Sequence, residues 1–231
     1  MKSLRDRSKA PWRLLIVGCL TLRALVAGAE PADEVRAAEL LVRKTYYEGM
    51  PFEAARALTP IGAARLIEML ADPAERSHAA NIVVALGIAS PPGAYEAIAA
   101  AAEVSTSGEV DRPTYRLLDA IPFAMGHLAR SDQRAFAWLR SRAEARGVDP
   151  GWSHGPFRGQ RLADQQRRRA IAGLGLSGRP EVPALLDAIA ADGASARRSV
   201  APDPELGSAV ESARDVQQRI ATEGADAALG R

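Results

Sequence analysis

Few side chains in this chain of 231 residues are suited to chemistry. The three histidines are His78, His127 and His154, and none has a second histidine or a carboxylate at the local spacing of a metal-binding motif. Gly-Trp-Ser-His-Gly at 151–155 fits the letters Gly-x-Ser-x-Gly, but it lies in a glycine-rich loop and not between a strand and a helix, so we expect no nucleophile elbow. The sequence contains no glycine-rich phosphate loop. We therefore predict no catalytic residue, no metal and no other cofactor, and the residue types favour binding over reaction.

The least generic stretch is the loop 147–160. It is rich in glycine and carries two aromatics, a histidine and an arginine: Trp152, His154, Phe157 and Arg158. Exposed aromatic side chains on a loop are costly unless they pack against the protein or contact a partner. Two interpretations follow. The aromatics pin the loop to neighbouring helices, or they form a recognition loop for a binding partner.

Four further arginines follow the loop, Arg161, Arg167, Arg168 and Arg169, of which Arg161, Arg168 and Arg169 are candidate binding residues. On a helix, Arg161 and Arg168 are seven residues apart and share a face. The planar guanidinium group binds carboxylates and phosphates through two parallel hydrogen bonds. The cluster predicts a basic stripe for an acidic peptide, an acidic protein surface or a phosphate. The alternative is a solvated helix face whose arginines pair with Asp164 and other local acids.

Helices are the elements that would position these side chains. Apolar residues recur at helical spacing through most of the chain, as in the series Ala63, Leu66, Ile67 and Leu70. Segments with proline and glycine separate such series, and no segment alternates with period two, so we expect no β-strands. Alanine fills 47 positions and aromatics only 5%, which suits closely packed helices. The sequence predicts an all-α fold.

Internal repetition is visible around three glycines, Gly87, Gly126 and Gly175. Ala-Leu-Gly at 85–87 parallels Gly-Leu-Gly at 173–175, and Ala-Met-Gly at 124–126 is a weaker copy. In each copy we expect an alanine-rich helix to end at a glycine-containing turn that a second helix follows. The glycines are 39 and 49 residues apart, and the longer interval contains the loop 147–160. Pro122 is expected to interrupt its helix.

A period near 40 residues with two helices per unit resembles HEAT repeats, especially the short bacterial kind. The best match is the stretch 63–73, AARLIEMLADP, followed by Ala-Ala at 79–80 and Ala-Leu-Gly at 85–87. The resemblance covers about residues 60–192. A tetratricopeptide array is the structural alternative, but its 34-residue period fits the glycine spacing less well.

The resemblance implies a right-handed α-α superhelix, a solenoid of about four helical hairpins whose second helices line the concave surface. We assign residues 30–193 to this solenoid. Residues 194–231 are expected to form a linker and a C-terminal helix, over 205–224, that caps the open end of the stack.

The N-terminus has the marks of a secretory signal peptide over residues 1–29. Five basic residues precede an apolar run over 14–26, and Ala-Gly-Ala at 27–29 supplies a site for cleavage after Ala29. This predicts a periplasmic or secreted protein. In one alternative, Ile-Val-Gly-Cys at 16–19 is a lipobox and Cys19 anchors a lipoprotein in the membrane. In another, the segment is retained as an anchor or is a cytosolic helix.

Removal of residues 1–29 changes the charge balance. The segment holds six basic residues and Asp6, so the remaining chain has 24 basic and 27 acidic residues, a net charge of −3, and no cysteine. Binding to nucleic acid requires a basic surface that neutralises phosphates, so we expect no nucleic-acid partner. We expect membrane association only if Cys19 is lipidated or the N-terminal segment is retained.

These observations favour an exported, non-catalytic scaffold or adaptor of the cell envelope that binds one or more protein partners. The rival hypothesis is an enzyme of lyase or hydrolase type with a concave-face site near the loop 147–160. It rests on the HEAT-like resemblance, because some HEAT-like proteins resemble bilin lyases and others are DNA glycosylases. The acidic chain and the predicted export argue against a glycosylase.

Overall fold

A computed structural model describes residues 30–46, 49–103, 107–146, 148–196, 203 and 205–230. The predicted signal peptide, its cleavage site and Cys19 lie outside these residues. The described helices are α1 (Pro31–Arg43), α2 (Phe52–Arg56), α3 (Pro60–Ala71), the 3-10 helix η1 (Pro73–His78), α4 (Ala79–Ala89), α5 (Ala94–Ala102), α6 (Arg112–Leu128), α7 (Gln133–Glu144), α8 (Gly159–Leu176), α9 (Val182–Ala196), α10 (Leu206–Glu223) and α11 (Ala225–Leu229). The all-α class is confirmed.

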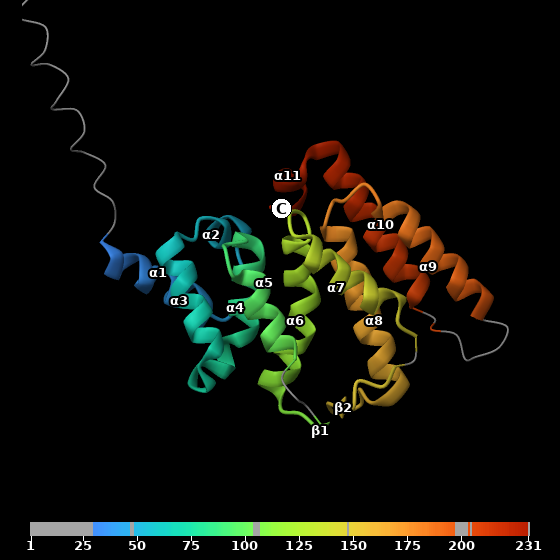
Figure 1. The fold of residues 1–231 in the computed structure, drawn as a ribbon, viewed down its shortest axis with the longest axis horizontal. Coiled ribbons are helices and arrows are strands. Elements are labelled where there is room, and N and C mark those ends of the chain that lie inside the picture. Colours follow the sequence, from blue (N-terminus) through green and yellow to red (C-terminus); the bar gives the residue numbers. More distant parts are fainter. Residues whose placement is uncertain are drawn as a thin grey trace, which may run out of the picture.

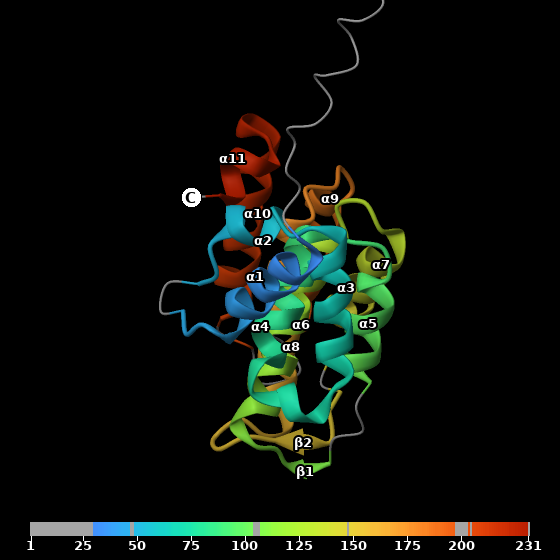
Figure 2. The same ribbon diagram turned by 90° about the vertical axis from the view of Figure 1, so that its left-hand side faces the viewer.

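The helices pack as sequential pairs in two layers (Figures 1 and 2). The pairs are α3–α4, α5–α6, α7–α8 and α9–α10. The second helices form the inner layer, and the interfaces α4–α6, α6–α8 and α8–α10 are the most extensive in the molecule. The helix expected over 205–224 is α10, which packs on α8 as the last inner helix.

Two short strands differ from the all-helical expectation. β1 (Gly108–Glu109) pairs in parallel with β2 (Trp152–Ser153), below the ends of the helices in Figure 1. A strand of two residues is too short to show an alternating pattern, so periodicity could not indicate it. The pair nevertheless fixes the loop 147–160 to the segment that leads into α6.

The repeated glycines lie where successive inner helices touch. Gly87, Gly126 and Gly175 sit in the last turns of α4, α6 and α8, and not in the connecting turns. A Cβ atom at Gly87 would lie 2.6 Å from the Cα of Ala124, and one at Gly175 would lie 2.8 Å from the Cα of Ala213. Real Cβ atoms do not approach backbone this closely, so these helices need glycine here.

Pro122 does not interrupt its helix, contrary to expectation. α6 continues from Arg112 to Leu128 with Pro122 inside it. Proline removes one backbone hydrogen bond and favours a kink, but burial between α4 and α8 stabilises this helix on two sides. The carbonyl of Pro122 lies against Gly173, where any side chain would clash.

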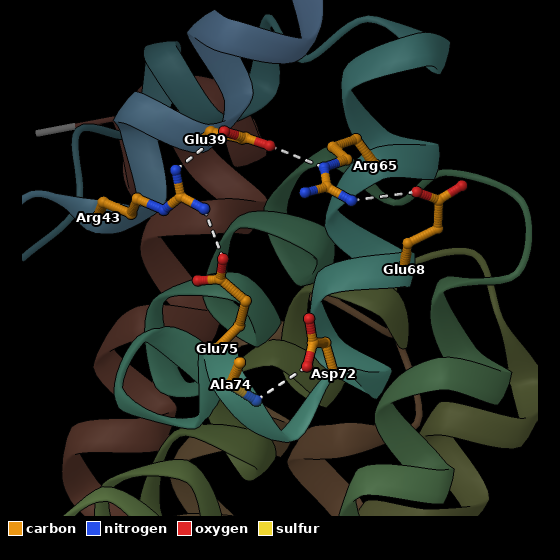
Figure 3. Close-up of polar contacts among 7 residues, drawn as sticks. All are labelled: Glu39, Arg43, Arg65, Glu68, Asp72, Ala74 and Glu75. Carbon is orange, nitrogen blue, oxygen red and sulfur yellow. Dashed lines mark hydrogen bonds and ion pairs between the residues drawn. The ribbon is translucent and has the colours of Figure 1, made fainter.

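A polar network ties α1 to the pairs that follow (Figure 3). Arg65 on α3 donates through Nε to Glu39 on α1 at 2.8 Å, and Arg43 donates to the other oxygen of Glu39 at 2.9 Å. Arg43 also reaches Glu75 in η1 at 2.5 Å. The hydrogen bond from Arg65, with the added charge of Arg43, lowers the pKa of Glu39. The network therefore orients α1 across the outer edge of α3.

The C-terminal helix α11 reaches back to the N-terminal helix α2 (Figure 1). Arg56 on α2 pairs with Asp226 on α11 at 2.9 Å, and Arg130 approaches the same carboxylate at 3.8 Å. A Cβ atom at Gly230 would contact the ring of Phe52 at 3.6 Å. The two ends of the helical array are thus joined. Within the described residues, no helix combines the length and the apolar character needed to cross a membrane.

Candidate functional site

The aromatic residues of the loop 147–160 gather around Tyr115 on α6. The ring of His154 stacks on Tyr115 with centroids 4.4 Å apart, and that of Phe157 stacks at 5.9 Å. Trp152 meets Tyr115 edge-on at 6.3 Å and is only 7% exposed. The structure thus brings three of the predicted site residues into one cluster, while Arg158 beside them is exposed.

Hydrogen bonds tie this Tyr115 cluster to the segment before α6 and to α8. Nδ1 of His154 lies 3.0 Å from the carbonyl oxygen of Val110, and Gln165 on α8 donates to the Tyr115 hydroxyl at 2.7 Å. The backbone N–H of Val110 donates to the Ser153 carbonyl at 2.9 Å. These contacts favour the interpretation that the aromatics pin the loop. A recognition role for the loop stays a prediction.

The three candidate arginines of α8 contact three different neighbours, and the fourth, Arg167, donates to the carbonyl of Ala143 at 2.8 Å. Arg161 lies over the Phe157 ring at 5.1 Å. Arg168 pairs with Asp203 at 2.7 Å and with Glu205 at 3.0 Å. Arg169 pairs with Asp119 on α6 at 2.8 Å, and Asp164 accepts from Gln160 instead. The arginines therefore engage the loop, the start of α10 and α6, and the structure does not align them as one open stripe.

A different region has the features of a binding site. A groove of about 610 Å³ crosses the inner layer, between Tyr46, residues 49–52, the inner helices and α11. This volume lies within the usual range of ligand sites. Four of the chain's eleven aromatic residues line it: Tyr46, Phe52, Tyr115 and Phe123. Phe123 is 42% exposed, which is unusual for so large an apolar side chain.

His127 forms part of the wall of the groove and has no polar partner. It is only 3% exposed, and neither ring nitrogen has a hydrogen-bond partner. The rings of Phe123 and Phe52 lie 4.8 Å and 5.8 Å from its own. Burial, with a smaller contribution from the charge of Arg130, lowers the pKa of His127 to about 4, so the imidazole is neutral at physiological pH.

Two cations of the groove are also unpaired. Arg116 on α6 and Arg219 on α10 are exposed, and neither side chain has an ion-pair or hydrogen-bond partner among the described residues. The acid beside them, Asp119, already pairs with Arg169 and accepts a hydrogen bond from Gln165. The groove therefore presents uncompensated positive charge around an aromatic floor.

A second hollow, of about 710 Å³, lies between η1 and the start of α6. Arg76 and Asp111 of this hollow are paired with each other at 3.1 Å, and Asp111 also accepts from the backbone and hydroxyl of Thr114. The hydrogen bonds from Thr114 lower the pKa of Asp111. This hollow offers a partner fewer unsatisfied groups than the groove does.

The groove residues were not identified from the sequence. Tyr115, Phe123 and His127 are spaced by eight and four residues on one helix, which places the three on neighbouring turns of the same side. That spacing is the feature of the sequence that could have indicated an aromatic surface on this helix. Phe52 and Arg219 carry no comparable signal, because only the packing of α2 and α10 brings them to the groove.

Comparisons with protein-family models, with curated proteins and with solved structures find no match to this chain. Among the described residues, no group of three or more His, Cys, Asp or Glu side chains is placed to hold a metal ion.

Proposed function

We propose that this protein is an exported, non-catalytic scaffold or adaptor with a HEAT-like solenoid fold, and that it binds a protein partner in the groove of its inner layer. The exported location rests on the signal-peptide pattern of residues 1–29.

The arrangement of the inner helices supports the solenoid part of the proposal. In a HEAT-like array the second helices of successive units run parallel and touch only their neighbours. Here α4, α6, α8 and α10 contact one another in that order, with repeated glycines at the contacts. Stacked arrays of this kind form extended concave surfaces that bind other proteins.

The exposed aromatic side chain of Phe123 carries the binding part of the proposal. It stands in a groove with other aromatics, beside a buried histidine without polar partners and two unpaired arginines. Such anchors are typical of protein interfaces, whose central contacts are enriched in aromatic residues and arginine. His154 of the loop 147–160 is engaged within the Tyr115 cluster, so the proposal places the binding site in the groove and not in this loop.

Site-specific photo-crosslinking in the native host tests this function. A benzoylphenylalanine at position 123 should crosslink to a discrete partner. The matched control is position 61, because Ile61 on α3 is 41% exposed but does not line the groove. Equal crosslinking at both positions, or none at 123, would contradict the groove as the binding surface.

Mass spectrometry of the protein purified from its native host tests export. We expect an N-terminus at Glu30. Recovery of a chain that begins at Met1 from the cytosol would contradict the exported location.

A further inference from the structure

We infer that the occupant of the groove is a peptide segment with an apolar middle and acidic residues toward both ends. This inference rests on the proposed function, since it names the chemistry of the partner that the groove binds. The charge of the groove, the positions of its two unpaired arginines and the apolar surface between them carry it.

The two arginines lie toward opposite ends of the groove. Arg116 lies in the second turn of α6, whereas Arg219 lies in the last turns of α10. The inner helices run parallel, because the C-terminal part of each touches the next at the contacts Gly87–Ala124, Gly126–Gly173 and Gly175–Ala213. Arg116 therefore stands near the level where the inner helices begin, and Arg219 near the level where they end.

Apolar side chains, together with the partly buried Asp119, make up the surface between these arginines. Phe123, Leu176 and Val216 come from three successive inner helices and all line the groove. An apolar side chain placed on Phe123 would bury its exposed ring, which is favourable by the hydrophobic effect. A single small anion could meet one arginine but not both, whereas an extended or helical segment could span them.

The charge of the groove then determines the charge that we expect of the partner. Asp119 is the acid that lines the groove together with the two arginines, and it is already paired with Arg169. A basic segment would therefore meet two uncompensated guanidinium groups, whereas carboxylates would form charge-assisted hydrogen bonds with them.

Selection from a random twelve-residue peptide library, performed on the purified full chain, tests the inference. We expect the selected peptides to be enriched in Asp and Glu toward both ends, around an apolar middle. The double variant Arg116→Glu/Arg219→Glu should bind these peptides at least about tenfold more weakly, and selection on it should favour Lys and Arg.

The matched control is Arg36→Glu/Arg140→Glu, which makes the same change of charge at two exposed arginines outside the groove and outside the loop 147–160. It should leave the selected sequences and their affinities unchanged. Circular dichroism and thermal unfolding verify the fold of each variant.

Three outcomes would overturn the inference. Enriched peptides without acidic residues, unchanged affinity in the groove variant, or equal loss in the control would each contradict the acidic partner while leaving peptide binding in place. Failure of the wild-type chain to enrich any sequence above the bare support would contradict the proposed function as well.

Discussion

Helix α6 carries two aromatic clusters that each contain a histidine, and they are built in opposite ways. Around Tyr115, His154 contacts a backbone carbonyl and Trp152 is buried. Around Phe123, His127 has no polar partner and the phenylalanine ring is 42% exposed. Buried polar groups are normally hydrogen-bonded, so the contacts of the Tyr115 cluster indicate a structural role. The unpaired imidazole and exposed ring of the Phe123 cluster favour a role in binding.

The largest effect on stability should come from the Tyr115 cluster. Trp152→Ala removes a buried indole and should lower the free energy of unfolding by about 3–5 kcal/mol, measured by urea denaturation. The control is Val148→Ala in the same loop, since Val148 is 65% exposed and should change stability by less than about 0.5 kcal/mol. If Trp152→Ala left stability intact but abolished partner binding, the Tyr115 cluster would be a binding site and its structural assignment would be wrong.

His127 should make stability depend on pH. The native state holds its pKa at about 4, against 6.5 for an ordinary histidine. As pH falls below about 6.5, the unfolded state takes up a proton that the native state does not. The free energy of unfolding should therefore drop by about 3 kcal/mol between pH 7 and pH 4.

Denaturation of wild type and His127→Phe across this range isolates the contribution of the histidine. The difference in unfolding free energy between the two proteins should change with pH by that amount. A constant difference would show that His127 is not held neutral by the fold.

The arginines of α8 should separate into structural and surface groups. Arg168→Gln leaves the carboxylate of Asp203, whose side chain is only 8% exposed, without its ionic partner. We expect a loss of about 2 kcal/mol in the free energy of unfolding. Arg169→Gln, at a side chain 52% exposed, should cost less than about 1 kcal/mol. Equal losses from the two variants, in parallel denaturation curves, would contradict the assignment of Arg168 to structure.

The smallest effect on stability should come from the groove. Phe123→Ser should change the free energy of unfolding by no more than about 1 kcal/mol, because the ring is partly in solvent. The same variant should abolish peptide binding, whereas Ile61→Ser, of nearly equal exposure, should preserve it. A large destabilisation without loss of binding would remove the distinction between the two clusters.

Apolar periodicity sufficed to predict the helical class, and the spacing of Gly87, Gly126 and Gly175 indicated a repeat before its cause was known. The cause is the close approach of backbones, which depends on two helices at once. Local sequence does not indicate the partner of Arg168 either, because Asp203 lies beyond the intervening helix α9. The groove was less predictable still, because Phe52 and Arg219 are unremarkable where each stands in the sequence.

The contact between α2 and α11 has a consequence for how the molecule comes apart. In an open array of stacked helix pairs, each unit meets only its neighbours and either end can fray alone. Here the salt bridge from Arg56 to Asp226 joins helices near the two ends of the chain. Loosening of α2 and loosening of α11 must break the same bond. Because both side chains are about half exposed, this salt bridge adds a modest coupling between two helices that are far apart in the sequence.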